Sequence, residues 1–444
     1  MTLMVGVSGV RGLVGHTLTP DVVLEFAQAY GTVVNGGRVV LGRDTRPSGE
    51  MFAAAAAAGL LAAGCEVTQL GVVMTPTAAH AVRSGGYAGG VLITASHNPA
   101  PWNGVKFLDA RGLAPSASRA AEIAVLRAQR RFGTRTQGFK PLRIEDQAGE
   151  RHVDAVLAAV EVDTLPLRGL RVVLDSVNGA GCLDTPALLA GLGCELLHLN
   201  GEPTGDFAHE PEPVEANLGQ LCRAVRQQRA AIGLAQDPDG DRLAIVDERG
   251  TYVGEEYTLA LAARSVLSRR PGPVAANLST SRLIDAIAER YGVPVVRTPV
   301  GEANVAAAML ARGCVVGGEG NGGVIDPRIS LVRDSLSAMS LVLQLMAATG
   351  QTVSQLVADL PRFAMVKQKL ECPRERATAA AEAVARAFAT ERVNRADGTR
   401  VDFAEGWVHV RPSNTEPIVR IFAEASDEPT ARRLLERVRA AAGL

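Results

Sequence analysis

A serine hydroxyl at position 96 stands where it could act as a nucleophile. It follows directly after the apolar run of residues 90–93, so we predict an exposed turn that a strand holds rigid. Adjacent residues of an extended strand point to opposite faces, so His97 is predicted not to hydrogen-bond to Ser96, and no G-x-S-x-G elbow surrounds the serine. A phosphorylated serine therefore fits better than a hydrolase nucleophile. Its roughly two negative charges would need a cation nearby.

Three aspartates, Asp237, Asp239 and Asp241, alternate along a loop that also contains Pro and Gly. Carboxylates at i, i+2 and i+4 on such a loop can converge on one hard cation. An EF-hand has acids at the same spacing, but its sixth position must be Gly, and this chain has Arg242 there. The apolar flanks also predict strands rather than helices. The loop therefore predicts a cation site between two strands.

A glycine-rich stretch at residues 317–323 contains a nominal G-x-G-x-x-G. Glu319 inside it would repel a pyrophosphate, and no later acid is well placed for a ribose. A dinucleotide site is therefore disfavoured, while a flexible glycine-rich turn stays open as an alternative.

A second polar turn, residues 411–417, lies between two predicted strands near the C-terminus. It combines a guanidinium, hydroxyls, an amide side chain and backbone N–H groups, which together form a natural phosphate cradle. The candidate residues are Arg411, Ser413, Asn414, Thr415 and, just beyond the turn, Arg420. A plain hairpin turn is the alternative.

The bulk properties describe an ordinary globular protein. At 444 residues the chain is too long for one core, so about two to four domains are expected. A net charge of -1 gives no global basic surface for nucleic acid. The six cysteines form no C-x-x-C pair, which argues against a zinc site and for a reducing compartment. We see neither a bilayer-spanning stretch nor a signal peptide, and so expect a cytoplasmic protein with small-molecule partners.

Three stretches share one plan of apolar strand, polar turn and helix. Their strands are predicted at residues 38–41, 171–174 and 273–276. Continuous apolar strands that alternate with helices indicate mostly parallel sheets buried on both faces. The recurrence at intervals of roughly a hundred residues, a usual domain size, suggests three related α/β domains. The chain from residue 365 onward differs and predicts a smaller α+β domain.

Taken in order, the four loops resemble those of the α-D-phosphohexomutases, the family of phosphoglucomutase, phosphomannomutase and phosphoglucosamine mutase. The resemblance covers essentially the whole chain. It implies an α/β fold of three related α/β domains with mixed, mostly parallel sheets, plus a smaller C-terminal α+β domain, around a central cleft. The implied spans are 1–150, 151–252, 253–364 and 365–444. One loop from each domain would meet in the cleft: phosphoserine, metal, sugar recognition and distal phosphate.

The resemblance also implies roles for individual residues. The implied Mg²⁺ ligands are Ser96, Asp237, Asp239 and Asp241, with the catalytic arginines Arg11 and Arg242 close to the phosphoserine. The distal phosphate would bind to Arg411, Ser413, Asn414, Thr415 and Arg420. Glu319 would recognise the sugar, since a carboxylate can accept hydrogen bonds from two neighbouring hydroxyls. The usual form of that loop is Gly-Glu-x-Ser-Gly-His. Asn321 and Gly323 replace its Ser and His, which leaves the sugar open.

The implied reaction interconverts hexose 1-phosphate and hexose 6-phosphate through phospho-Ser96 and a bisphosphorylated sugar, with hexose 1,6-bisphosphate as activator. Lys106 is our candidate general acid/base, and we expect the metal and the arginines to lower its pKa. His97 is the alternative.

The glycine-rich loop resembles an archaeal-type branch associated with phosphoglucosamine and phosphomannose mutation, and we take phosphoglucosamine mutase as the favoured activity. The alternatives are a phosphomannomutase/phosphoglucomutase of broad specificity, a metal-dependent sugar-phosphate phosphatase and a catalytically silent sugar-phosphate sensor. The expected partner is a small-molecule sugar phosphate. Neither nucleic acid nor a membrane is expected, and a homodimer is left open.

Overall fold

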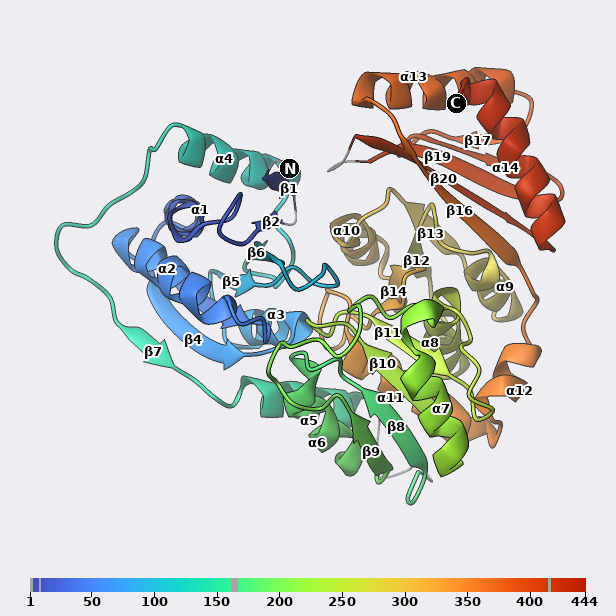
Figure 1. Ribbon diagram of the computed structural model, residues 1–444, viewed down its shortest axis with the longest axis horizontal. Coiled ribbons are helices and arrows are strands. Elements are labelled where there is room, and N and C mark those ends of the chain that lie inside the picture. The colour runs from blue at the N-terminus through green and yellow to red at the C-terminus, as the bar shows by residue number, and fades with distance from the viewer. Residues whose placement is uncertain (1–2, 8, 161–166, 414–416) are drawn as a thin grey trace.

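The computed structural model describes residues 3–7, 9–160, 167–413 and 417–444. Its four β-sheets follow one another along the chain, and the domains built on them form an arc from the first to the fourth (Figure 1). In these described parts, no helix is both long and apolar enough to cross a membrane.

The first domain is a seven-stranded mixed sheet with helices on both faces. Val39 and Leu41 pack under α1 and α2 on one face, and Val40 packs under α3 on the other, as the alternation of side chains along a strand requires. The strands are β1 (Met4–Gly6), β2 (Gly9–Leu13), β3 (Arg38–Arg43), β4 (Glu66–Val72), β5 (Gly89–Ile93), β6 (Trp102–Leu108) and β7 (Leu142–Ile144). The helices are α1 (Pro20–Val33), α2 (Gly49–Ala62), α3 (Thr75–Ser84) and α4 (Ala117–Ala128).

The second and third domains each contain a four-stranded sheet. The second comprises α5 (Ala148–Val160), β8 (Arg171–Asp175), α6 (Gly181–Gly191), β9 (Glu195–Leu199), η2 (Glu215–Asn217), α7 (Gly219–Gln228), β10 (Ile232–Gln236) and β11 (Leu243–Val246). The third comprises α8 (Glu255–Arg269), β12 (Val274–Asn277), α9 (Leu283–Arg290), β13 (Val295–Thr298), α10 (Glu302–Arg312), β14 (Val316–Glu319), β15 (Gly323–Ile325), α11 (Ser335–Thr349) and α12 (Val353–Ala358). One hydrophobic core runs through both, because α8 and α11 pack against residues of each sheet.

The first three domains repeat one strand order. The repeated motif reads β4-β3-β5-β6, then β9-β8-β10-β11, then β13-β12-β14-β15. In each motif the first three strands of the chain are parallel, and the fourth runs antiparallel to the third. The three strands predicted from the sequence are β3, β8 and β12, the first strand of each motif. The prediction of three related α/β domains is therefore confirmed.

The fourth domain is a five-stranded antiparallel sheet with two helices packed on one face. Its elements are β16 (Ala364–Glu371), α13 (Arg374–Ala387), β17 (Arg392–Asn394), β18 (Thr399–Asp402), β19 (Gly406–Pro412), β20 (Ile418–Ala425) and α14 (Glu428–Ala442). The predicted α+β class of this domain is confirmed. In Figure 1 the sheet lies beside the third domain.

Candidate active site

Three of the four predicted loops occupy equivalent places in the fold. Each connects the third strand of a motif to the antiparallel fourth strand. The Ser96 loop joins β5 to β6, the aspartate loop joins β10 to β11, and the glycine-rich loop joins β14 to β15. The strands that lead into them are buried along their whole length, which fixes where each loop starts.

Ser96 is buried, contrary to the expectation of an exposed turn: its relative exposure is 1%. The aspartate loop of the second domain covers it, and the Ser96 hydroxyl donates a hydrogen bond of 2.9 Å to Asp237 Oδ2. The sequence could not show this, because the covering loop lies 141 positions away along the chain.

His97 contacts Ser96, so the prediction that the two side chains point apart was wrong. Ser96 Oγ lies 3.3 Å from His97 Nδ1. The strand has already ended here, because Ser96 has a φ of 52°, and the alternation of an extended strand no longer applies. Burial, together with the guanidiniums of Arg242 and Arg11, holds the pKa of His97 well below its usual value. The imidazole is therefore neutral.

Arg46, which is 1% exposed, holds the Ser96 loop in shape. Its guanidinium donates to the carbonyl oxygens of Ser96, Asn98, Pro99 and Trp102 at 2.6 to 2.9 Å. Sequence reasoning did not assign Arg46 to the site. The available signal was its position in the polar stretch directly after β3, the strand beside β5 in the sheet.

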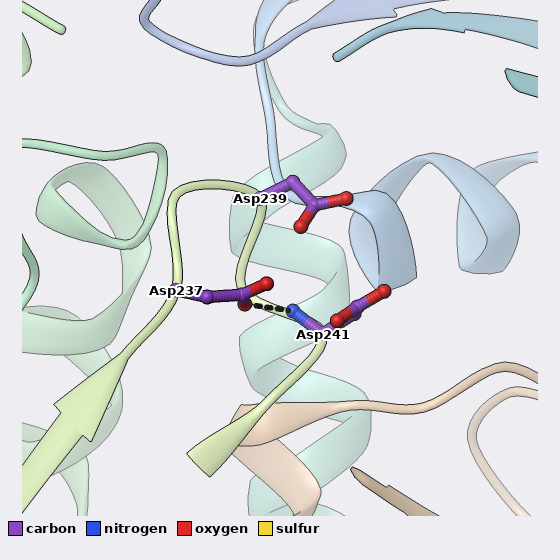
Figure 2. A group of neighbouring side chains, drawn as sticks. All are labelled: Asp237, Asp239 and Asp241. Atoms are coloured by element: carbon purple, nitrogen blue, oxygen red, sulfur yellow. Dashed lines mark hydrogen bonds between the residues drawn. The ribbon is translucent and has the colours of Figure 1, made fainter. Parts of the chain in front are cut away.

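The three aspartates converge, as predicted (Figure 2). One carboxylate oxygen from each lies within 4.8 Å of the others. The loop turns at Gly240, whose φ is 66° and where a Cβ would lie 2.5 Å from Met74 Sδ. Burial and the neighbouring charges of Asp241 and Asp239 raise the pKa of Asp237 well above its usual value.

This arrangement fits a hard cation. Asp239 Oδ1 and Asp241 Oδ1 are buried and accept no hydrogen bond from any described residue. Buried oxygens of this kind are costly unless they are paired or coordinate a metal. Oxygen-only ligand sets select Mg²⁺, Ca²⁺ or Mn²⁺.

Lys106 reaches the aspartate loop from β6. Its ammonium lies 2.5 Å from Asp239 Oδ2 and 3.3 Å from Asp241 Oδ2. Burial lowers the pKa of Lys106, but attraction to these carboxylates outweighs it, so the pKa lies above its usual value. The lowering expected from the arginines is present for Arg11, but it is smaller than the effect of the two carboxylates.

Two arginines flank the serine and aspartate loops. Arg242 donates from its backbone N–H to Asp237 Oδ1 at 3.1 Å, and its guanidinium lies 3.3 Å from Glu212. Arg11, on β2, donates to Asn98 Oδ1 at 2.9 Å and thus touches the Ser96 loop. Arg11 and Lys106 line a cavity of about 170 Å³ beside these loops.

Glu319 ends β14 and is buried among donors. Its Oε1 accepts from Asn277 Nδ2 at 2.8 Å and from the Gly301 backbone at 3.0 Å, and its Oε2 accepts from Arg333 at 3.0 Å. Asn321 Oδ1 is buried with no hydrogen-bond partner among the described residues.

Arg333 was not predicted as a site residue, although its side chain contacts two of the predicted loops. Besides Glu319, its guanidinium contacts Asp241 Oδ2 at 2.7 Å. It lies outside both motifs, just before α11, so no local pattern marked it.

The fourth loop is described only in part, since Asn414 and Thr415 lie outside the described residues. Arg411 and Arg420 face each other across β19 and β20. Arg411 also pairs with Asp397 at 2.9 Å within its own domain, and Ser413 is buried at the end of β19. The fourth domain is attached to the third, where Ser279 Oγ lies 2.9 Å from His409 Nδ1.

Models of the four domains of one protein family match the chain in succession. "Phosphoglucomutase/phosphomannomutase, alpha/beta/alpha domain I" matches residues 2–132, domain II matches 150–250, domain III matches 254–363, and the C-terminal domain matches 365–441. The order of these matches is the order of the four sheets.

Whole-chain relatives agree. A protein of Methanopyrus kandleri described as "Probable phosphoglucosamine mutase" is 40% identical over 97% of this chain and 95% of its own length. A "Phosphoglucomutase/phosphomannomutase" of Thermococcus kodakarensis is 38% identical over 98% of this chain and 97% of its own. A crystal structure of a phosphoglucomutase/phosphomannomutase family protein from Burkholderia thailandensis matches with a TM-score of 0.87 at 29% identity, covering 99% of this chain and 98% of that one. The chain therefore belongs to the phosphoglucomutase/phosphomannomutase family, the phosphohexomutases, and is an isomerase that acts by intramolecular phosphoryl transfer.

Proposed function

We propose that this phosphohexomutase is a phosphoglucosamine mutase, which interconverts glucosamine 1-phosphate and glucosamine 6-phosphate. Relatives described as phosphoglucosamine mutases, at 40% and 35% identity, support the proposal. The glycine-rich loop supports it as well, because its sequence resembles an archaeal-type branch associated with phosphoglucosamine and phosphomannose mutation. A phosphomannomutase/phosphoglucomutase of broad specificity is the second candidate, since the Thermococcus kodakarensis relative carries that description. The relatives give no support to a phosphatase or a sensor.

The observation that carries the chemistry is the contact between Ser96 and the aspartate loop. Ser96 Oγ lies 2.9 Å from Asp237 Oδ2, so a phosphoryl group on Ser96 would lie against the three carboxylates. In the proposed reaction, the bond between Ser96 Oγ and phosphorus breaks as a bond from phosphorus to the free sugar hydroxyl forms. The resulting bisphosphorylated sugar turns over, and its other phosphoryl group returns to Ser96. Hexose 1,6-bisphosphate would supply the first phosphoryl group.

We propose Mg²⁺ as the cation, held by Asp237, Asp239, Asp241 and an oxygen of phospho-Ser96. When bound, it neutralises negative charge on the transferring phosphoryl group. Arg242 and Arg11 add positive charge on the other sides of the Ser96 loop.

Proton transfer is proposed for His97, beside the serine, and for Lys106, beside the aspartate loop. The sugar hydroxyl must lose a proton, and Ser96 Oγ must gain one as it leaves. His97 is neutral and 3.3 Å from Ser96 Oγ, so it can accept a proton. Lys106 is held in its charged form by Asp239 and Asp241, so it can donate one.

Recognition of the sugar is proposed for Glu319 and Asn321. The phosphate that does not react would bind to Arg411, Ser413, Asn414, Thr415 and Arg420. This cradle must accept a phosphate at either O1 or O6, so its tolerance matters more than a close fit.

A turnover assay tests the proposal. Glucosamine, glucose and mannose 6-phosphates are each given to the purified protein with Mg²⁺ and a trace of the matching 1,6-bisphosphate, and the 1-phosphates are quantified. A clear preference for glucosamine 6-phosphate is expected. Comparable rates on glucose and mannose phosphates would favour the broad-specificity alternative. An absence of isomerisation with all three sugars would contradict the proposal.

A further inference from the structure

Arg333 lies between β15 and α11, where its backbone is firmly held. The next residue, Asp334, is the N-cap of α11 and accepts a hydrogen bond of 3.0 Å from the Leu336 backbone. The Asp334 backbone N–H donates to the Val324 carbonyl at 2.8 Å. The base of the Arg333 side chain is thus fixed by a helix start and a strand.

The guanidinium of Arg333 spans carboxylates from three segments. Its Nη2 contacts Asp241 Oδ2 at 2.7 Å, its Nη1 contacts Glu319 Oε2 at 3.0 Å, and its Nε contacts Glu302 Oε2 at 3.0 Å. The side chain is 13% exposed. A planar fork of this kind fixes geometry as well as charge, which a lysine cannot reproduce.

The contact to Asp241 uses one oxygen only. Asp241 Oδ2 accepts from Arg333 and Lys106, while Oδ1 is left without a hydrogen-bond partner among the described residues. Arg333 thereby sets which oxygen of Asp241 faces the proposed cation. Arg333 Nη1, which donates to Glu319 Oε2, sets the orientation of that carboxylate, the proposed sugar ligand.

Gly323 makes room for this arrangement. A Cβ on Gly323 would lie 2.1 Å from Arg333 Cδ and 2.8 Å from its Cγ. A side chain of any other residue at this position would collide with Arg333 in its present place. Gly323 and Arg333 are therefore one structural feature.

We propose that Arg333 is a positioning residue that couples the metal loop to the sugar-recognition loop, in the space that Gly323 leaves open. The inference rests on the proposed function of these two loops. It goes further, because it makes the geometry of each loop depend on the other.

Arg333→Lys tests the proposal, because it keeps the charge and removes the fork. Mn²⁺ binding to the purified, sugar-free protein is measured by calorimetry, and KM for glucosamine 6-phosphate is measured separately. We expect Mn²⁺ binding to weaken by about tenfold and KM to rise, as for loss of groups that orient metal ligands. Arg328→Lys, an exposed arginine paired with Asp326 on the same segment, is the matched control and should change neither.

The opposite result would separate positioning from simple charge. If Arg333 acted only as a positive charge, Arg333→Lys would leave Mn²⁺ affinity and KM unchanged, and Arg333→Gln would tighten Mn²⁺ binding; either result overturns the proposal. Mn²⁺ binding requires no turnover, so this failure is distinct from an absence of isomerisation by the wild-type enzyme.

Gly323→Ala provides a second test. The new Cβ should displace the Arg333 side chain and raise KM in the wild-type background, but have little effect in an Arg333→Ala background. Contacting residues are expected to be non-additive in this way. An equal effect of Gly323→Ala in both backgrounds would contradict the proposal.

Discussion

The hydroxyl of Ser96 and the carboxylate of Asp237 meet in the protein interior, where burial changes the chemistry of both. Ser96 is 1% exposed, so a phosphoryl group on it would be shielded from water and from wasteful hydrolysis. The same burial holds three carboxylates close together. Burial, together with the repulsion among them, raises the pKa of Asp237 and makes this loop a place where a cation would stabilise the fold.

Ser96→Ala should reduce isomerisation by at least about a thousandfold, as removal of a nucleophile does in other enzymes. The fold should persist, since only a hydroxyl is lost. Rates of glucosamine 1-phosphate formation and melting temperatures measure the two effects. Ser118→Ala, on the exposed face of α4, is the control. Retention of isomerase activity by Ser96→Ala would exclude a phosphoserine mechanism.

Mg²⁺ should raise the melting temperature of chelator-treated protein, because a ligand that binds only the native state stabilises it, by about 2.7 kcal/mol at a hundred times its Kd. Asp239→Asn should shrink the Mg²⁺ effect, since one of the three proposed carboxylate ligands loses its charge. Thermal unfolding with and without Mg²⁺ measures both. Asp21→Asn, at the exposed start of α1, should behave as wild type. An undiminished Mg²⁺ shift in Asp239→Asn would argue against this site.

At the scale of elements, the fold places three of the predicted site loops at the same point of a repeated motif. Each loop follows a fully buried third strand and leads into an antiparallel fourth strand. A loop in that place is anchored at both ends by sheet hydrogen bonds. The Ser96 loop is the longest of the three, and it is the one that Arg46 braces from within.

Arg46→Lys should lower kcat by about a hundredfold, because a displacement of about 1 Å at the reacting group can have that effect. A lysine cannot donate to four carbonyls of the Ser96 loop at once. KM should change little, since Arg46 touches no proposed sugar ligand. Steady-state kinetics and the rate of Ser96 phosphorylation by the bisphosphate check this. Arg43→Lys in the same stretch is the control, and equal losses in both variants would refute the bracing role.

At the scale of the whole molecule, the domains are joined in two ways. The second and third share one apolar core. The fourth is held to the third by polar contacts, among them Arg282 N–H to Glu424 at 2.9 Å and Val300 N–H to Asp397 at 3.0 Å. An apolar core is closely packed and rigid, whereas polar contacts can be exchanged for water. The contacts that hold the fourth domain are therefore ones that water can replace.

His409 makes this contact sensitive to pH. Burial lowers its pKa to about 4, with Arg411 and Arg400 adding to the effect and Asp397 opposing it. The unfolded chain takes up a proton near pH 6.5. Stability is therefore present above that pH and is lost as pH falls, by about 2 kcal/mol between pH 7 and pH 5.

Thermal unfolding from pH 7 to pH 5 should show this loss in the wild type and less of it in His409→Gln. Glutamine can still donate to the Asp397 carbonyl and accept from Ser279, but it does not titrate. His16→Gln, at an exposed histidine, is the control. Identical pH dependence in wild type and His409→Gln would show that another group causes the loss of stability.

The sequence by itself determined the parts that depend on local pattern. Apolar runs gave the strands β3, β8 and β12, and their spacing gave three related domains. The alternating aspartates and the loop that contains Ser96 predicted a cation site and a nucleophile, because both predictions need only residues that are neighbours along the chain. The resemblance to a family then supplied the order of the loops.

Only the tertiary structure decided how those loops meet. The burial of Ser96 depends on Asp237 from another domain, and the raised pKa of Lys106 depends on which charges lie nearest in space. Arg46 and Arg333 act on loops 50 and 92 positions away, so no local pattern could mark them. Charge and burial act through distance in space, which chain folding sets and which sequence spacing does not record.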